Sequence, residues 1–393
     1  MNRNTDFIPF ARPSIGCEEE QALLSVLRSG WLTTGKETEA FENEFAAFVK
    51  SKHALAVSSA TAGLHLALDA LGVGPEACVV TTPYTFAATA EVARYLGADP
   101  LFVDIEETSG NIDSDALSRC LERHQSIRAI IPVHFAGLPC DMDAISELSD
   151  RFRVPVVEDA AHCFPVRIGD EFVGTIGQAG VYSFYVTKPI TTGEGGMLVT
   201  ESDTMARRVR LMRLHGIDRD VWDRYTSGSG SWDYRITEAG YKYNLTDMAS
   251  AIGRIQLQRA EKLLVERRRI AAQYLAALAE SDFLTLPLEA ENHAWHLFVV
   301  RLATEKLTIS RDEFIARLRE RGIGVSVHFR PLHMMPYYER TYHYCPQDFP
   351  VSLANYLCSV SLPIYPGLSD EQIERVVRAL KEIGTAAYKK TPG

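Results

Sequence analysis

Between residues 54 and 200 the sequence alternates short apolar runs with segments of helical periodicity. The runs that predict strands lie at 54–59, 78–83, 100–105, 127–135, 154–159, 180–186 and 197–200. The segments that predict helices lie between them, at 60–72, 86–97, 114–123 and 142–152. This alternation is typical of an α/β fold with a mostly parallel sheet between helices. Ligands of such sheets bind beyond the carboxyl ends of the strands.

An acid and an amine follow two of these predicted strands. Asp159 ends the run 154–159, and Lys188 follows the run 180–186, just before a glycine-rich turn. The neighbouring Glu158 should point to the opposite face, because side chains alternate along a strand. Taken alone, Asp159 is either a helix cap or a ligand-binding acid. Lys188 is either a solvated lysine or a partly buried amine with a lowered pKa.

An acid and a lysine at one edge of a sheet suit pyridoxal 5'-phosphate (PLP). The aldehyde of this cofactor condenses with a lysine amine, and its ring nitrogen needs a carboxylate partner to stay protonated. The strand-to-helix turn at 58–61 offers hydroxyls and free amides, which make either a phosphate site or an ordinary helix cap. The sequence has no GxGxxG or GxxxxGK[ST] motif, which argues against a Rossmann dinucleotide site or a P-loop.

Several other residues have two interpretations each. His162 is either a core histidine or a contact of the cofactor's phenolic oxygen or ring. Phe86 is either a core aromatic or a ring that stacks on a planar cofactor. Trp31 lies in a Gly-Trp-Leu-Thr-Thr-Gly turn, where it either packs at a domain edge or lines the site.

Two segments of the C-terminal half also carry candidates. In GYKYNLTD, Lys242 and Asn244 form either a charged helix entry or an arm that reaches a phosphate in a partner subunit. In HFRPLHMM, His328 and His333 are substrate contacts or packing residues. No third ligand has convincing spacing, so no metal site is predicted.

A long helical pattern from residue 246 to about 278 contains the predicted domain boundary. We expect a large PLP-binding domain at 1–260 and a smaller α+β domain at 261–393. The stretch 216–240 is rich in glycine, serine, aspartate and aromatics, and we interpret it as a flap over the site. Its aromatic residues are Trp222, Tyr225, Trp232 and Tyr234.

Composition excludes several classes of protein. The 393 residues are 46% hydrophobic and 23% charged, as in globular proteins. A net charge of −10 disfavours general nucleic-acid binding. No apolar run approaches the roughly 18–20 residues that span a bilayer. The N-terminus lacks an apolar signal core, so we expect a cytoplasmic protein. Seven scattered cysteines without a CxxC motif predict reduced thiols.

In their order along the chain, the motifs resemble a known family. The chain is similar to the DegT/StrS-type nucleotide-sugar aminotransferases, which are PLP enzymes of the aspartate aminotransferase fold (fold type I). The resemblance covers nearly the whole chain, and the segments that carry it are SSATAGLHLAL, TPYTFAAT, EDAAH, SFYVTKPITTGEGG and GYKYNLTD. Within the family, FARPSIG, SGWLTTGK, HAWHLFVVRL and ISRDEF most resemble the UDP-4-amino-4-deoxy-L-arabinose–oxoglutarate aminotransferases of lipid A modification.

The resemblance implies roles for matching residues. Lys188 matches the lysine that binds the aldehyde, and Asp159 the partner of the ring nitrogen. His162 matches the residue at the phenolic oxygen, and Phe86 the stacking aromatic.

The resemblance also implies a phosphate site shared between two subunits. Ser183 and the amides of Ala60 and Thr61 match the phosphate cradle. Family members are homodimers, and an asparagine of their GYNYR segment reaches the neighbour's phosphate. Here Lys242 stands in its place and Asn244 in that of the arginine.

The function implied is transfer of an amino group from L-glutamate, which leaves as 2-oxoglutarate, to a keto-sugar on a nucleotide diphosphate. A UDP-4-keto sugar for lipopolysaccharide, lipid A or O-antigen is the first choice, with 3-keto and 4-keto-6-deoxy hexoses as alternatives. In the branch of the family that dehydrates sugars, a histidine replaces this lysine. The presence of Lys188 therefore favours transamination. A PLP-binding regulator without turnover is a further alternative. The sugar nucleotide should lie in the cleft between domains, near Trp31, His328 and His333.

Overall fold

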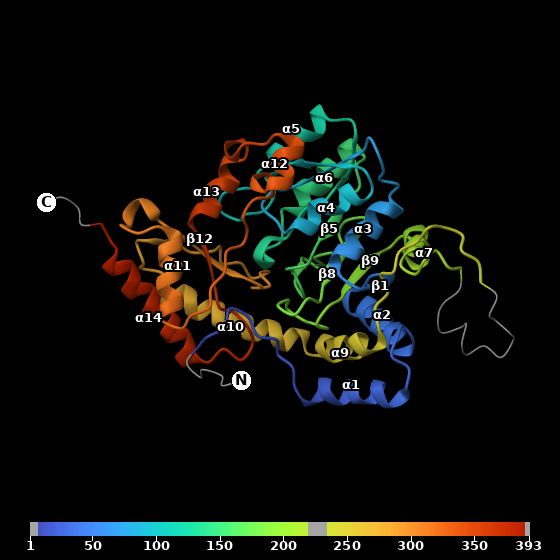
Figure 1. Cartoon of the computed structure of the whole chain (residues 1–393), viewed down its shortest axis with the longest axis horizontal. Coiled ribbons are helices and arrows are strands. Elements are labelled where there is room, and N and C mark those ends of the chain that lie inside the picture. Colours follow the sequence, from blue (N-terminus) through green and yellow to red (C-terminus); the bar gives the residue numbers. More distant parts are fainter. Residues whose placement is uncertain (1–6, 219–233, 390–393) are drawn as a thin grey trace.

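The structure is a computed structural model that describes residues 7–218 and 234–389. Figure 1 shows a large region around the long sheet and, beside it, a smaller region that contains the C-terminal helices. Two helices, α1 (Cys17–Ser29) and α2 (Lys36–Val49), precede the sheet, and α1 lies along α9 (Asp247–Gln258).

The large sheet consists of two groups of strands joined at β5. One group is ordered β1 (His53–Val57), β9 (Gly196–Thr200), β8 (Ala179–Ser183), β5 (Val157–Asp159), and the other β3 (Asp99–Phe102), β2 (Cys78–Thr81), β4 (Ile127–Ile130). Parallel bridges from Ile130 to Val156 and from Val133 to Asp159 connect β4 to β5. Only β9 runs antiparallel to its neighbours, so the sheet is mostly parallel, as predicted.

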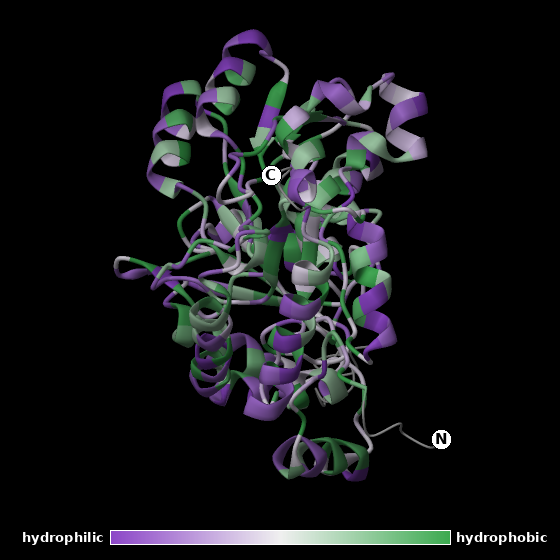
Figure 2. Ribbon diagram, turned by 90° about the vertical axis from the view of Figure 1, so that its left-hand side faces the viewer, coloured by the Kyte–Doolittle hydropathy of each residue, from purple (hydrophilic) through white to green (hydrophobic). Residues whose placement is uncertain are grey.

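Helices cover both faces of this sheet. They are α3 (Ala60–Ala70), α4 (Ala87–Tyr95), α5 (Ser114–Arg123), α6 (Met142–Phe152) and α7 (Asp203–Met212), together with α2 and α9. Along β8, Val181 packs in a cluster with α3, whereas its neighbour Tyr182 packs against Phe41 and Phe45 of α2. This alternation buries both faces of the strand. Figure 2 shows the resulting pattern, with hydrophobic strands inside and hydrophilic positions on the outer helices.

The C-terminal region has its own antiparallel sheet, ordered β10 (Leu284–Thr285), β11 (Phe298–Leu302), β12 (Ser359–Leu362). It packs with α10 (Ala260–Leu278), α11 (Arg311–Glu320) and α14 (Asp370–Ala386). Within α10, Leu263 belongs to a cluster of the large region and Ile270 to the C-terminal cluster. Ile8 also belongs to the C-terminal cluster and pairs with Ile323. The predicted division at residue 260 assigned Ile8 to the large domain.

Helices α12 (Pro336–Tyr342) and α13 (Pro350–Cys358) attach the C-terminal region to the edge of the large sheet (Figure 1). The Asp104 carboxylate accepts from the amides of Val351 and Ser352, both at 2.9 Å. The remaining short elements are β6 (Arg167–Ile168), β7 (Glu171–Phe172) and 3-10 turns at Phe135–Gly137, Thr304–Lys306, Leu332–Met334 and Pro346–Asp348.

Several predicted strands are longer than the observed ones. The runs predicted at 78–83 and 127–135 end at Thr81 and Ile130. The run predicted at 180–186 ends as β8 at Ser183, because its partner β9 begins opposite it at Gly196. The chain then turns, and the Lys188 amide donates to the Tyr185 carbonyl at 2.9 Å.

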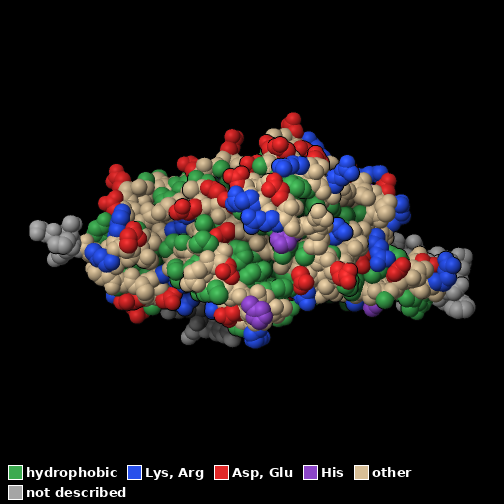
Figure 3. Space-filling model, turned by 90° about the horizontal axis from the view of Figure 1, so that it is seen from above, with side chains coloured by type: hydrophobic (Ala, Val, Ile, Leu, Met, Phe, Trp, Pro, Cys, Tyr) green, Lys and Arg blue, Asp and Glu red, His purple; other side chains and the backbone are tan. Residues whose placement is uncertain are grey.

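Two further features are the distribution of charge on the surface and the apolarity of the helices. On the face seen in Figure 3, acidic and basic side chains are interspersed rather than gathered by sign. Among the described residues, no helix combines the length and apolarity that crossing a membrane requires.

Candidate active site

A cavity of about 440 Å³ opens at the carboxyl ends of β5 and β8. This volume is within the range of small-molecule sites. Its walls include Ser59, Ala60, Thr61, Thr85, Phe86, Thr89, Asp159, Ala161, His162, Ser183, Lys188, His296, His328 and Phe329. The last three come from the C-terminal region, so the cavity lies between the two regions.

Lys188 and Asp159 face this cavity and influence each other electrostatically. Burial lowers the pKa of Lys188 to about 8, although the nearby Asp159 carboxylate opposes the shift. With that pKa, about a tenth of the amines are unprotonated at pH 7, far more than for an ordinary lysine. Burial raises the pKa of Asp159, while Thr89, the Ala161 amide and Lys188 act in the other direction. The structure thus supplies a reactive amine beside an acid.

The Asp159 carboxylate accepts two hydrogen bonds from the described residues, one on each oxygen. The Thr89 hydroxyl donates to Oδ2 at 2.8 Å, and the Ala161 amide donates to Oδ1 at 3.2 Å. A carboxylate offers about four acceptor positions. The unused capacity is available to a donor in the cavity, such as a protonated ring nitrogen.

Two buried histidines with unsatisfied ring nitrogens face the cavity. His162 lies with its ring 4.5 Å from that of His296 and stacks on Phe329 at 5.9 Å. The Nδ1 atoms of both histidines are buried and have no hydrogen-bond partner among the described residues. Burial, followed by the charge of Lys188, holds both pKa values well below the usual range. Both rings are therefore neutral, and each is suited to a ligand that completes its hydrogen bonds.

The N-terminus of α3 forms a cradle for an anion. Ser59 caps this helix, while the amides of Ala60 and Thr61 donate to no acceptor in the described parts of the chain. Ser183, at the end of β8, lines the same end of the cavity. A Cβ at Gly196 would lie 2.7 Å from the Ala60 amide nitrogen, so only glycine lets β9 pass this close. Open amides at a helix N-terminus fit a phosphate.

Phe86 lines the cavity from the large region, and His328 lines it from the C-terminal region. Phe86 precedes α4, its side chain is 64% exposed, and its ring lies 6.5 Å from that of Phe329. His328 stacks on Phe10, and its Nδ1 is 2.8 Å from the Ser361 hydroxyl. Burial, followed by Lys188, lowers the pKa of His328 to about 4, so this ring is neutral too.

Three other predicted site residues lie outside this cavity within one chain. The Trp31 indole donates to the Thr34 carbonyl at 3.1 Å. The Lys242 amine donates to Asn244 Oδ1 at 2.6 Å, and the Asn244 amide nitrogen donates to the Thr34 hydroxyl at 2.6 Å. They contribute to a cofactor or substrate site only if a second subunit brings one to them.

His333 packs in the protein interior and does not line the cavity, so it is not a substrate contact there. Its side chain is fully buried, its Nε2 lies 3.1 Å from the Pro346 carbonyl, and its ring packs on Phe349. Of the predicted flap, Trp222, Tyr225 and Trp232 lie outside the described residues, and Tyr234 is exposed.

Thr89, His296 and Phe329 are among the cavity residues that were not predicted from the sequence. Thr89 lies one helical turn after Thr85, and its hydroxyl contacts both Thr85 and Asp159. His296 and Phe329 follow Asp159 by more than a hundred residues, and only tertiary packing brings them to it. The one available signal was a histidine placed just before the apolar strand β11.

Comparison with known proteins agrees with this chemistry. The profile of the DegT/DnrJ/EryC1/StrS aminotransferase family matches residues 13–381. The chain is 41% identical over 386 residues to the spore coat polysaccharide biosynthesis protein SpsC of Bacillus subtilis, covering 98% of each. Its structure resembles the PMP form of Spr1654, a putative sugar aminotransferase from Streptococcus pneumoniae, with a TM-score of 0.90, 28% identity and coverage of 96% of this chain and 99% of that one.

A second solved structure is similar over the same length. Helicobacter pylori PseC, an aminotransferase involved in the biosynthesis of pseudoaminic acid, gives a TM-score of 0.89 at 27% identity, with 97% and 100% of the two chains covered. The predicted fold class and cofactor are confirmed by these matches. The chain therefore belongs to the DegT/DnrJ/EryC1/StrS aminotransferase family and is a PLP-dependent sugar aminotransferase of fold type I.

Proposed function

We propose that this enzyme moves an amino group from L-glutamate to the keto group of a sugar carried by a nucleotide diphosphate, with a UDP-linked 4-keto sugar as the preferred acceptor. The observation that carries the proposal is the placement of Lys188 and Asp159 in one cavity between the two regions. The lining of the cavity includes both the α3 cradle and His328 of the C-terminal region.

The residues divide the work as follows. Bound PLP supplies an electron sink and carries the amino group between the two half-reactions. The amides of Ala60 and Thr61, with Ser183, would hold its phosphate, and Asp159 would keep its ring nitrogen protonated. His162 would contact its phenolic oxygen, and Phe86 would stack on its ring.

Lys188 moves the protons of the reaction. In the first half, its Nζ accepts a proton from the Cα of L-glutamate, which its lowered pKa permits near neutral pH. In the second half, with the keto-sugar bound, it returns a proton to the sugar carbon that receives the amine. One site thus serves both substrates in turn.

Three finer points belong to the same proposal. The amino sugar enters a cell-surface glycan such as lipopolysaccharide or its lipid A, which the name of SpsC, a spore coat polysaccharide biosynthesis protein, supports in kind. The enzyme is a cytoplasmic homodimer. Trp31, Lys242 and Asn244, which lie away from their own cavity, reach that of the partner.

A screen in the reverse direction tests the proposal. Purified protein is incubated with PLP, 2-oxoglutarate and a panel of UDP-, GDP- and dTDP-linked amino sugars, and L-glutamate is measured. We expect UDP-4-amino-4-deoxy-L-arabinose to react fastest and Lys188→Ala to give no glutamate. If a 3-amino or 4-amino-6-deoxy sugar reacts faster, the proposed acceptor is wrong, but the proposed amino transfer still holds. If no amino sugar of the panel yields glutamate, the proposal is wrong.

A further inference from the structure

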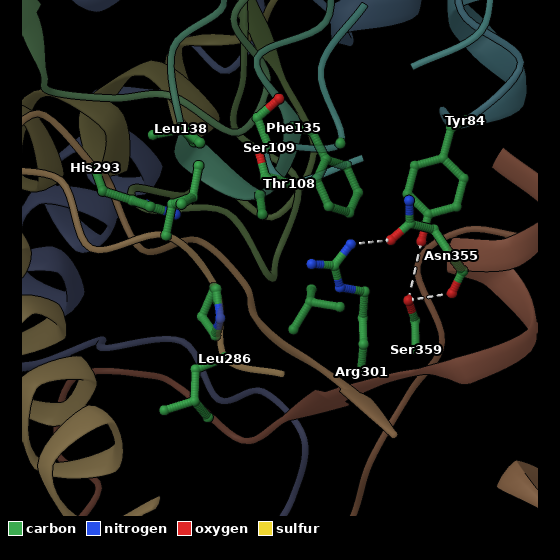
Figure 4. Close-up of a pocket in the computed structure, with 15 residues that line it drawn as sticks. Tyr84, Thr108, Ser109, Phe135, Leu138, Leu286, His293, Arg301, Asn355 and Ser359 are labelled. Carbon is green, nitrogen blue, oxygen red and sulfur yellow. Dashed lines mark hydrogen bonds between the residues drawn. The ribbon is translucent and has the colours of Figure 1, made fainter. Parts of the chain in front are cut away.

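A second, smaller cavity lies between the large and the C-terminal region. Its volume of about 40 Å³ is enough for a water molecule and too small for a cofactor. Tyr84 and Phe135 line it from the large region, and Arg301, Asn355 and Ser359 line it from the C-terminal region. Figure 4 shows the polar ends of Tyr84, Arg301, Asn355 and Ser359 pointing towards one another. This cavity is therefore a polar joint between the two regions.

The hydroxyl of Tyr84 makes the bond that crosses this joint to the active site. It lies 2.8 Å from the His328 carbonyl and 3.2 Å from the Ser359 hydroxyl. Ser359 in turn lies 2.5 Å from the Asn355 carbonyl, which takes its only proton. The single proton of Tyr84 is therefore committed to His328. Burial raises the pKa of Tyr84, so the phenol remains a donor at any physiological pH.

The His328 carbonyl depends on this bond. No amide among residues 7–218 and 234–389 donates to it. Leaving this part-buried carbonyl without a donor is unfavourable, so the bond restrains where residues 328 and 329 lie.

The restrained segment forms one wall of the cofactor cavity. The ring of Phe329 stacks on His162 at 5.9 Å and lies 6.5 Å from Phe86. The ring of His328 faces the cavity as well. A shift of this backbone would therefore change the surroundings of both His162 and Phe86.

The loop that carries Tyr84 also orders the acid side of the site. Thr85, the next residue, lies 2.9 Å from the Thr89 hydroxyl, which donates to Asp159. Phe86 follows directly. One short loop thus contacts the Asp159 side of the cavity through Thr85 and the C-terminal wall through Tyr84.

We propose that Tyr84 is a positioning residue, whose bond to the His328 carbonyl fixes the C-terminal wall of the cavity against bound PLP. The role is independent of which amino donor or sugar the enzyme uses. It can therefore be tested with PLP alone, and its failure would leave the proposed substrates untouched.

The test compares two changes of the same chemistry in the PLP-loaded protein. Tyr84→Phe removes the hydroxyl that bonds His328. Tyr274→Phe removes an equally buried hydroxyl, which donates to the Pro363 carbonyl at 3.0 Å in the C-terminal core. We expect Tyr84→Phe to raise the Kd of PLP three- to tenfold and to alter the visible circular dichroism of the bound cofactor. Tyr274→Phe should leave both unchanged, even where it lowers the melting temperature as much.

Two more variants locate the effect. Ser359→Ala leaves the bond from Tyr84 to His328 in place, so it should bind PLP as the wild type does. In a Phe329→Leu background, the wall has already changed, and Tyr84→Phe should raise the Kd less than twofold further. Wild-type binding and dichroism in Tyr84→Phe, equal effects of both tyrosine changes, an effect of Ser359→Ala as large as that of Tyr84→Phe, or full additivity with Phe329→Leu would each overturn the proposal.

Discussion

Glu158 and Asp159 are consecutive carboxylates of β5, and the protein treats them in opposite ways. Glu158 is fully buried and accepts from the amides of Gly174, Ile176 and Gly177 at 2.7 to 2.8 Å. It also accepts from His134 Nε2 at 3.1 Å. Four donors fill its four acceptor positions. Asp159 has two donors and faces a cavity.

The number of hydrogen-bond donors distinguishes the structural carboxylate from the functional one better than burial does. Both carboxylates are almost wholly inaccessible, so exposure alone would class them together. His134 Nδ1 accepts from the Cys140 amide, which leaves the ring proton on Nε2 and directs it to Glu158. Every position around Glu158 is thus occupied by the protein itself. The incomplete shell of Asp159 is what a ligand would complete, and it marks the functional member of the pair.

Asp159→Asn should produce the largest effect and only on catalysis. The change removes the charge but keeps the shape and an acceptor for Thr89. We expect amino transfer to fall by about a thousandfold, equivalent to about 4 kcal/mol of lost transition-state stabilisation, because the ring nitrogen loses its charged partner. The melting temperature should change by less than about 2 °C. Turnover and thermal melting of purified variants check this, and near-normal turnover would refute the assignment of Asp159.

Glu158→Gln should do the reverse. The amide nitrogen of glutamine would face backbone N–H donors, so at least one buried bond is lost and the charge no longer strengthens the others. We expect a destabilisation of about 3 kcal/mol and a melting temperature lower by roughly 5 °C. Turnover below the transition should stay within about threefold of wild type. A large loss of turnover without a loss of stability would break the distinction between the two residues.

The contrast also shows which parts of the site could be predicted from the sequence. Alternation along a strand was enough to predict that only one of the two carboxylates reaches the cavity. Local patterns likewise predicted the helices at 114–123 and 142–152 with their observed bounds. These signals are local, because apolar spacing and capping residues reflect what one segment must bury.

The rest depends on contacts between distant segments. The donors of Glu158 come from a turn at 174–177, and the cavity walls of His296 and Phe329 come from another region. No periodicity in the sequence encodes such encounters. His328 and His333 lie in one segment and had the same two interpretations, yet His328 faces the cavity and His333 packs on Phe349. Trp31, Lys242 and Asn244 do not line the cavity of their own chain, and the role proposed for them would require a second chain.

The pH dependence of cofactor capture should distinguish the two carboxylates through Lys188. Only the unprotonated amine attacks an aldehyde, and the pKa of Lys188 is lowered to about 8. The rate at which PLP-free protein takes up PLP should rise about tenfold per pH unit below pH 8 and level off above it. Asp159→Asn removes a charge that raises this pKa, so the midpoint should move down, whereas Glu158→Gln should not move it. Stopped-flow absorbance measures the rates. A rate that keeps rising to pH 10 would show that Lys188 titrates as an ordinary lysine.

Thr89→Val tests the smallest element of the contrast, a single donor to Asp159. The change keeps the side-chain shape and removes the hydroxyl that lies 2.8 Å from Oδ2. Without this donor the pKa of Asp159 should rise further, which weakens its charge towards the ring nitrogen. One lost hydrogen bond of about 1 kcal/mol corresponds to a roughly fivefold slower turnover. Thr81→Val is the matched control, because Thr81 is equally buried but donates to the Ile131 carbonyl within the sheet, at 2.8 Å. It should cost similar stability and leave turnover unchanged. If both variants slow turnover equally, the Thr89 hydroxyl affects turnover only by stabilising the fold. Its hydrogen bond to Asp159 would then have no separate role in catalysis.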